Sequence, residues 1–500
     1  MTWLILTILQ SLFAKTYGGA SQDLAYSIAP TAEGGYVIAG YTSSFGAGNC
    51  DFLVIKLGPD GSLSWARTYG GPDDDRAFSV IQTSDQGYLV GGYTRSFGAG
   101  ASDFLVIKLE PDGSLSWART YGGTSSDEAH SLTQTSDGGY ALAGNTISFG
   151  GDISGSDLIL RLNPDGSIAW ARTFGATNYV DTAYSIIQTS DGGYAVTGHG
   201  VFSLTGFDIF VLKLNSDGSP AWGRAFSTGD YNDFAYSIAQ TADGGLMVAG
   251  ESYNFGTYPK ALLLKLNPDG SLSWAKAYGG SSFDHAYSLI QTADGGYVLA
   301  GSTGSFGAGN DDALLIKLNS DASVAWGRTV GGGIWEYASS VIQNNDGGFA
   351  VAGRHGDGVF DIFAFSLDTS GNYPGCAIPC NPIVSTPSIS VFSVSGAAPC
   401  SPDISVPNLS ITAPSLTITD MCPPLNLKDR ITVQKPGITC HAVPGGLVFV
   451  ASEEVSIRMY KPDGRLVYSG ELRKGETRIG LEQGVYLWQV TTYKGKAIVR

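Results

Sequence analysis

A phrase of ten residues occurs twice in this chain, and this repetition limits the possible folds more than any other feature. SLSWARTYGG stands at 62–71 and again at 114–123. Its tryptophan recurs at spacings of 52 or 53 residues, as Trp65, Trp117, Trp170, Trp222, Trp274 and Trp326. Phe13 lies 52 residues before Trp65 and takes the same place, so the phrase begins seven times. A period of about 50 residues is typical of propellers, solenoids and other arrays.

Each repeat predicts four short strands. In residues 168–212 the apolar segments IAWARTFG, AYSIIQT, YAVTG and DIFVLKL follow one another. The SDGG between the second and third segments, and the NSDGS after the fourth, contain residues that tolerate positive φ and make tight turns. Four antiparallel strands without helical periodicity predict a propeller blade. Leucine-rich units, the alternative, are shorter and hold one strand each.

The two ends of the repeated region predict how the ring closes. The seventh repeat has no outer strand after residues 361–367, whereas FAKTYGG, from Phe13, is an outer strand without a blade before it. Pairing the two would remove an exposed sheet edge. We therefore expect an all-β protein in which residues 13–375 form a seven-bladed β-propeller closed by the N-terminal strand.

The repeat resembles a known family. Its consensus runs from W-A-R-T-Y-G-G through S-I-x-Q-T-x-D-G-G-Y-x-V-A-G to I-K-L-N-P-D-G-S, and it resembles the bacterial seven-bladed β-propeller repeat abbreviated SBBP. The resemblance covers roughly residues 13–375. It implies a secreted or surface propeller and leaves the ligand open.

The C-terminal segment, 446–500, resembles something else. It is similar to the C-terminal sorting domain (type A) of the type IX, or Por, secretion system. The matching positions are Tyr460-x-x-Asp463-Gly464-Arg465-x-Val467, Leu481-x-x-Gly484-Val485-Tyr486 and Lys496-x-x-Val499-Arg500. The usual Pro-Asn-Pro opening is replaced by AVPGG. The resemblance implies a small β-sandwich that the secretion machinery recognises during outer-membrane export; an accessory β-sandwich without that role is the alternative.

The remaining segments predict an exported chain with a linker. Residues 1–12 carry a short apolar run that predicts a signal peptide, and no stretch is long enough for a stable membrane span. Residues 376–445 are rich in Ser, Thr and Pro, with a recurring Pro-x-Ile/Leu-Ser/Thr pattern, and hold five of the six Cys. They predict an extended linker, as a flexible spacer or a glycosylated stalk. We expect disulfides in an oxidising compartment, and free thiols are the alternative.

The charge distribution excludes some partners. The net charge is −16, and residues 1–375 hold 17 basic and 36 acidic side chains, a balance of −19. Because a phosphate backbone needs a basic face, we expect no nucleic-acid partner. The acidic body suits an exported protein, and we expect a monomer.

One acidic residue precedes the second segment of every repeat. A residue that every blade carries serves a need that every blade has, such as accepting backbone N–H bonds in its loop. We prefer this structural role to a ring of cation ligands. The repeat acids are Asp23, Asp75, Asp127, Asp181, Asp233, Asp284 and Glu336.

Residues that are not repeated are better candidates for specificity. The loop after the third segment departs from its usual text at 199–208, 252–261 and 354–361, on the face that also holds the acid-containing loops. Such loops often carry binding residues, although drift of a surface loop is the alternative. The candidate ligand-binding residues are His199, Tyr253, Tyr258, Lys260, Arg354, His355 and Asp357.

The sequence contains no catalytic motif. A nucleophile elbow, a phosphate-binding Gly loop and HExxH are all missing, so we predict no catalytic residue, metal or cofactor. We expect a secreted or cell-surface module, non-catalytic and either binding or structural, whose partner is a surface polymer, a glycan or a protein. The alternative is an exported hydrolase or lyase that acts on polysaccharide or a small ester, with carboxylates that converge across blades.

Overall fold

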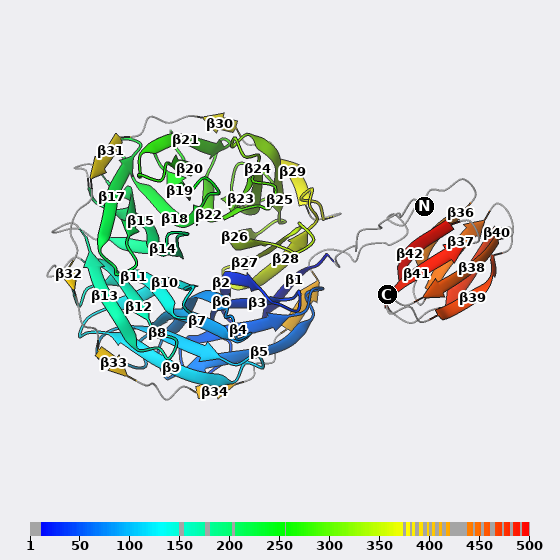
Figure 1. Ribbon diagram of the computed structural model, residues 1–500, viewed down its shortest axis with the longest axis horizontal. Coiled ribbons are helices and arrows are strands. Elements are labelled where there is room, and N and C mark those ends of the chain that lie inside the picture. Colours follow the sequence, from blue (N-terminus) through cyan, green and yellow to red (C-terminus); the bar gives the residue numbers. More distant parts are fainter. Residues whose placement is uncertain are drawn as a thin grey trace. The chain divides into compact units, whose positions relative to one another are not determined.

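The computed structural model describes residues 12–373, apart from 150–154, 176–180, 203–205 and 256, and beyond them only the strands between 377 and 499 (Figure 1). The chain divides into two units, Gln10–Cys422 and Met1–Leu9 with Pro423–Arg500. Most of the predicted signal peptide, residues 1–11, lies outside the described residues. Within the described part, no helix has the length and apolar character that a membrane crossing needs.

Seven sheets, the last of them closed by the N-terminal strand, form a ring of blades, which confirms the predicted all-β seven-bladed propeller. In the first six blades the four main strands run from the axis outward in chain order, and neighbouring strands are antiparallel. The first blade contains β2 (Asp23–Pro30), β3 (Tyr36–Thr42), β4 (Asp51–Leu57) and β5 (Leu63–Gly70).

The remaining blades repeat this order. Their strands are β6 (Asp75–Gln82), β7 (Tyr88–Thr94), β8 (Asp103–Leu109) and β9 (Leu115–Gly122); β10 (Asp127–Gln134), β11 (Tyr140–Thr146), β12 (Ser156–Leu162) and β13 (Ile168–Phe174); β14 (Thr182–Gln188), β15 (Tyr194–Gly200), β16 (Asp208–Leu214) and β17 (Pro220–Ser227); β18 (Asp233–Gln240), β19 (Leu246–Ser252), β20 (Lys260–Leu266) and β21 (Leu272–Gly279); β22 (Asp284–Gln291), β23 (Tyr297–Thr303), β24 (Asp312–Leu318) and β25 (Val324–Val330); and β26 (Trp335–Gln343), β27 (Phe349–Asp357) and β28 (Val359–Leu367).

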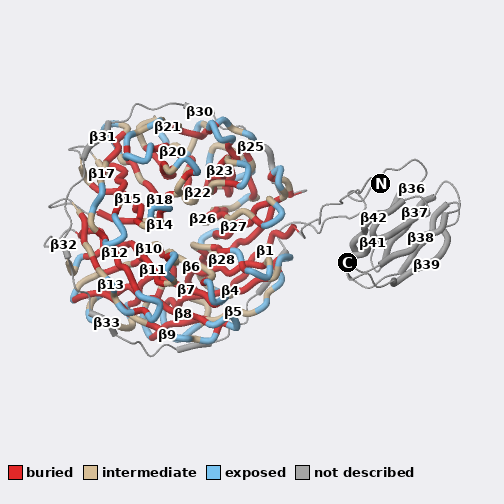
Figure 2. Tube along the Cα trace, viewed as in Figure 1, coloured by how far each residue is buried: buried red, intermediate tan, exposed pale blue. Residues whose placement is uncertain are grey.

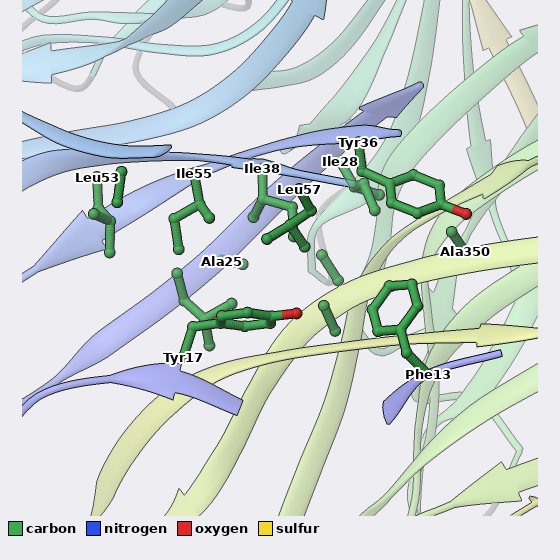
Figure 3. Packing of buried hydrophobic residues seen from close by; sticks show 14 residues of the cluster. Phe13, Tyr17, Ala25, Ile28, Tyr36, Ile38, Leu53, Ile55, Leu57 and Ala350 are labelled. Carbon is green, nitrogen blue, oxygen red and sulfur yellow. The ribbon is translucent and has the colours of Figure 1, made fainter. Parts of the chain in front are cut away.

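The N-terminal strand β1 (Ala14–Gly18) closes the ring as predicted. It pairs antiparallel with β28 over four residue pairs, from Ala14 with Phe365 to Tyr17 with Ile362. Phe13 and Tyr17 enter a buried cluster that joins the seventh blade to the first (Figure 3). The first and last repeats are therefore fastened by strand pairing and by apolar packing.

The apolar core lies between neighbouring blades. The middle strands β3 and β4 are buried along their whole length, and Figure 2 shows buried residues in strands all around the ring. The repeated tryptophans pack across the interfaces, since the Trp65 ring lies 5.9 Å from the Tyr88 ring of the next blade. Large rings in these positions fill the wedge between two sheets.

The segment predicted as a linker pairs with the propeller. Between 377 and 420, seven short strands each add a fifth strand to one blade and pass the blades in reverse order. They are β29 (Ala377–Cys380), β30 (Ile383–Ser385), β31 (Ser390–Ser393), β32 (Ala398–Pro399), β33 (Asp403–Ser405), β34 (Ser410–Thr412) and β35 (Thr417–Asp420). The sequence predicted an extended segment, but it did not predict these pairings.

The predicted disulfides stay a prediction. Among the side chains that the structure describes, Cys50 and Cys380 are free thiols. Cys376, Cys400 and Cys422 lie outside the described residues, and Cys440 is described only as backbone.

The C-terminal unit contains two antiparallel sheets. One has the order β36 (Ile438–Val443), β37 (Gly446–Ala451), β40 (Gly475–Gly480). The other has the order β39 (Leu466–Leu472), β38 (Val455–Tyr460), β41 (Gly484–Val490), β42 (Tyr493–Val499).

Candidate ligand-binding site at the propeller axis

A β-bulge in every innermost strand turns one side chain away from its sheet. In β2 the pairing with β3 shifts between Ala25 and Ser27, so Tyr26 has no partner residue. Gly40 lies opposite, where an added Cβ would come within 1.7 Å of the Leu24 carbonyl oxygen, so the bulge requires glycine there. Bulges redirect side chains and frequently lie beside binding sites. The seven bulged residues are Tyr26, Phe78, His130, Tyr184, Tyr236, Tyr287 and Ser339.

Six of these bulged residues are aromatic and meet around the axis. From Tyr26 to Tyr287, successive ring centroids lie 5.0, 5.3, 4.7, 5.5 and 5.6 Å apart. All six residues keep partial exposure to solvent. We call these six residues the aromatic collar. In the seventh blade the same position is Ser339, and we call it the gap of the collar.

A ring of hydrogen bonds holds the collar in place. The serine after each bulge accepts a bond from a backbone N–H on the innermost strand of the next blade, at 3.1–3.3 Å. The last bond, from Ile28 N to Ser340 Oγ at 3.3 Å, joins the seventh blade to the first. The spacing of the collar is therefore fixed by the fold before any ligand arrives.

A second set of side chains lies beside the collar. It comes from the residue that follows the glycine opposite each bulge, which we call the post-glycine position. This position differs between most blades, because its occupants are Tyr41, Tyr93, Asn145, His199, Glu251, Ser302 and Arg354. Two of them, His199 and Arg354, are predicted ligand residues.

Arg354 lies beside the gap without an acidic partner. Its Cζ is 4.2 Å from the centre of the Tyr337 ring and 5.4 Å from that of Phe360. Its guanidinium forms no ion pair and no hydrogen bond with the described residues, and its Nε is buried. Phe360 and Tyr26 pack against the same small buried cluster, so the guanidinium over Phe360 lies close to the collar. Burial raises the pKa of Tyr26, and the charge of Arg354 acts against this rise.

Arg76 approaches Tyr26 from the second blade. Its Cζ lies 4.5 Å from the centre of the Tyr41 ring, and its Nε is also buried without a partner. Its single acidic contact is loose, with Nη2 3.8 Å from Asp74 Oδ2. Like Arg354, it opposes the rise in the pKa of Tyr26. Two guanidinium groups thus flank the first blade's side of the collar.

The fifth blade carries a buried acid with partners. Glu251 is 4% exposed, accepts a hydrogen bond from Tyr236 Oη at 3.0 Å and pairs with His285 Nδ1. Beyond His285 lie Phe283 and Tyr258, whose rings are exposed and 4.6 Å apart.

Two other predicted ligand residues meet around Phe234. His199 is buried, with its ring 4.6 Å from Phe234 and 5.2 Å from Tyr184 of the collar. Burial lowers its pKa to about 4, so the imidazole is neutral at pH 7. The Tyr253 ring lies 6.1 Å from Phe234.

Two predicted ligand residues are engaged by neighbouring acids, and a third, Asp357, is exposed. Lys260 Nζ lies 3.2 Å from Asp284 Oδ2 and 2.7 Å from the Ser282 carbonyl oxygen. Five of the other six blades have Asp at the position equivalent to Lys260 in the third strand. His355 Nδ1 lies 2.9 Å from Glu336 Oε1. Asp357 is exposed at the end of β27.

The repeat acids are buried and accept hydrogen bonds from their loops. Asp23 accepts one from the Gly19 backbone N–H and one from Ser44 Oγ, both at 2.7 Å. Asp75 accepts the corresponding bonds from Gly71 and Ser96. In the described part of the chain, no group of three or more His, Cys, Asp or Glu could hold a metal ion.

The collar and Glu251 were not among the residues predicted from the sequence. The structure places His130 in the collar and His285 against Glu251. The signal was available, because the residue three after the repeat acid is aromatic in six of seven repeats.

Comparison with known proteins supports the fold. A family model described as a β-propeller domain of unknown function, DUF5122, matches residues 87–115 and 241–272. The fold and this match define the chain as a seven-bladed β-propeller. No curated protein matches it.

Three solved structures match the chain at low sequence identity. PorZ, a bacterial surface component of the type-IX secretion system of Porphyromonas gingivalis, is 12% identical with a TM-score of 0.40, and the match covers 97% of this chain and 60% of PorZ. This chain therefore spans less than two thirds of the length of PorZ. Sqt1 from Chaetomium thermophilum is 12% identical with a TM-score of 0.41, covering 73% and 86% of the two chains. A protein of unknown function from Dyadobacter fermentans is 11% identical with a TM-score of 0.40, covering 71% and 97%.

Proposed function

We propose that this protein is a secreted or cell-surface propeller that acts as a non-catalytic binding module and takes its ligand at the aromatic collar. The observation that carries the proposal is the collar itself, with six partly exposed aromatic side chains beside two arginines. Aromatic and arginine side chains dominate the energetics of many binding sites. The collar is also rigid, so a ligand would not have to order it.

The collar side chains do more than pack the blades. The interfaces between blades are filled by other residues, such as Trp65, Tyr88 and Leu109. The hydrogen bonds that fix the inner strands come from the serines, not from the collar. The exposed parts of the collar rings, and a post-glycine side chain without an internal partner such as Arg354, are therefore available for a partner. We expect this partner to be a surface polymer, a glycan or another protein.

A binding screen tests this proposal. The full-length protein is applied to arrays of surface polysaccharides and to surface proteins, beside the double variant Tyr184→Ala/Tyr236→Ala. We expect a ligand of the wild type that the collar variant no longer binds. Ile147→Ala is the control, because this side chain is exposed and outside the collar. If the collar variant and the Ile147→Ala control bound the ligand equally well, the binding site would not be at the collar.

The proposal includes export. We infer that residues 1–12 act as a signal peptide and that residues 446–500 form a small β-sandwich recognised by the type IX secretion machinery. The motif around Tyr460 and Gly484–Tyr486 supports this role, and these residues belong to strands β38 and β41 of the C-terminal unit. Deleting 446–500 should hold the protein inside a type-IX-competent cell. Undiminished release into the medium would contradict the sorting role.

The second candidate is an exported hydrolase or lyase. The buried contact between Glu251 and His285 favours it, because a carboxylate beside an imidazole can transfer protons. A panel of polysaccharide and ester substrates tests this candidate, with Glu251→Gln as the variant. Turnover that disappears in the variant would support an enzyme, whereas an inactive wild type would leave the binding module.

A further inference from the structure

The gap of the aromatic collar combines a missing side chain with an arginine that has no acidic partner. Six blades place an aromatic ring at the bulge, but the seventh places only the hydroxymethyl group of Ser339. The rings of Tyr287 and Tyr26 follow in the neighbouring blades on either side. Arg354 lies beside this position in the same blade, since β27 pairs it with Tyr337, two residues before Ser339.

No described residue forms an ion pair with Arg354. Tyr337, on whose ring the guanidinium lies, donates its hydroxyl to Asp311 Oδ2 at 3.1 Å, and His355 engages Glu336. The buried Nε of Arg354 has no hydrogen-bond partner among the described residues. The guanidinium therefore keeps a charge that the described residues do not neutralise, and an anionic ligand could do so at its terminal Nη groups.

We propose that the gap binds a single carboxylate carried on a ring, with the carboxylate on Arg354 and the ring in the position of the missing seventh collar side chain. The proposal deepens the binding function above and rests on it. The planar guanidinium matches a carboxylate with two parallel hydrogen bonds. The faces of Tyr26 and Tyr287 are the surfaces against which the ring would lie.

The charge of the protein favours one anionic group over many. With a net charge of −16, the chain repels a polyanion at long range, and Arg354 and Arg76 are local exceptions. Arg76 stands on the far side of Tyr26 and would attract the same anion more weakly, since Asp74 already lies 3.8 Å from it. A ring with one carboxylate occurs in acidic sugars and in aromatic acids, and the structure fits their shared chemistry.

Titration calorimetry on the full-length protein tests the site with four probes: glucuronate, benzoate, acetate and glucose. We expect glucuronate or benzoate to bind, and acetate and glucose to bind at least about tenfold more weakly, because each lacks the ring or the charge. The stronger of the first two identifies the source of the ring. Equal binding of acetate, or no binding of either ring acid, would overturn the proposal.

Variants separate the gap from the rest of the surface. Arg354→Met keeps the length of the side chain and removes the charge, and should weaken the ring acid about 30-fold or more. Ser339→Phe would fill the gap of the collar and should weaken binding of the ring acid by a similar factor. Arg95→Met is the matched control, because Arg95 is half exposed and its Nη1 lies 3.6 Å from Asp74 Oδ2. Its affinity should change less than about twofold.

The outcomes also separate this inference from the proposed function. Thermal unfolding of each variant shows whether it folds as the wild type does. If the collar variant loses a surface ligand while the ring acids bind to no protein, the binding module stands and the gap site falls. If Arg354→Met binds the ring acid as the wild type does, the proposed site at the gap is wrong, whatever the result of the binding screen.

Discussion

Two post-glycine residues, Glu251 and Arg354, occupy equivalent positions in the fifth and seventh blades but have opposite surroundings. Each follows the glycine opposite a bulge, and each lies beside the collar. Glu251 accepts a hydrogen bond from Tyr236 and contacts His285 of the next blade. Arg354 has aromatic neighbours and no acid. The fold satisfies one charge internally and leaves the other for a partner.

The difference shows how a repeat protein builds an asymmetric site. The bulge, its glycine and its serine recur in every blade and fix seven equivalent positions around the axis. Specificity then depends on which side chains occupy those positions and whether their neighbours complement them. Substitutions at Glu251 and Arg354 should therefore affect different properties, stability in the first case and binding in the second.

The largest expected effect is on Glu251. Glu251→Ala removes the acceptor of Tyr236 and the partner of His285, so two polar groups in a mostly buried region lose their contacts. We expect the free energy of unfolding to fall by about 3 kcal/mol, measured by urea denaturation. Glu251→Gln retains an acceptor and should cost less than half as much. A Glu251→Ala variant as stable as the wild type would mean that the contacts of Glu251 do not stabilise the fold, so that Glu251 would not differ from Arg354 in this respect.

The blades and the closure of the ring were predictable from the sequence, whereas the bulged residues and the contacts of Glu251 were not. Seven repeats with DGG and PDGS turns predicted the blades, and the unmatched Phe13 strand predicted the closure with β28. The bulge adds one residue within a strand, so the period-2 pattern does not reveal that Tyr26 or His130 turns toward the axis. The contact between Glu251 and His285 joins two blades, which no pattern within one repeat can indicate.

The candidate residues divide in the same way. Loop divergence pointed to His199 and Arg354, which the structure places beside the collar, and equally to Lys260 and His355, which are engaged by Asp284 and Glu336. Divergence marks positions that differ between blades. It does not distinguish a side chain that a neighbouring acid neutralises from one that has no partner.

A smaller effect is expected from pH at a third post-glycine residue, His199. Burial lowers the pKa of His199 to about 4, so the unfolded chain binds its proton more readily than the folded chain. Its contribution to stability is complete above about pH 6.5 and is lost as the pH falls toward about 4. His199→Phe should remove about 1–3 kcal/mol of this acid sensitivity.

The acids near the blade interfaces act in the opposite direction, so the variant must be compared with the wild type at each pH. Burial raises the pKa of Asp51 and of Asp312 to about 6, and this lowers stability as the pH rises from about 4 to about 6. Asp51→Asn is the matched variant and should flatten that opposing slope. Parallel stability curves for His199→Phe and the wild type would show that His199 is not the acid-sensitive group.

The smallest effect on stability should come from Arg354, even though its effect on binding should be large. Arg354→Met keeps an apolar stem against Tyr337 and Phe360, and it removes both the cation–π contact and the buried Nε that lacks a partner. The first loss costs about 0.5–1 kcal/mol and the second change recovers a similar amount. The free energy of unfolding should therefore stay within about 0.5 kcal/mol of the wild type. A loss of stability as large as that of Glu251→Ala would show that Arg354 has an internal partner in solution. The contrast between Glu251 and Arg354 would then disappear.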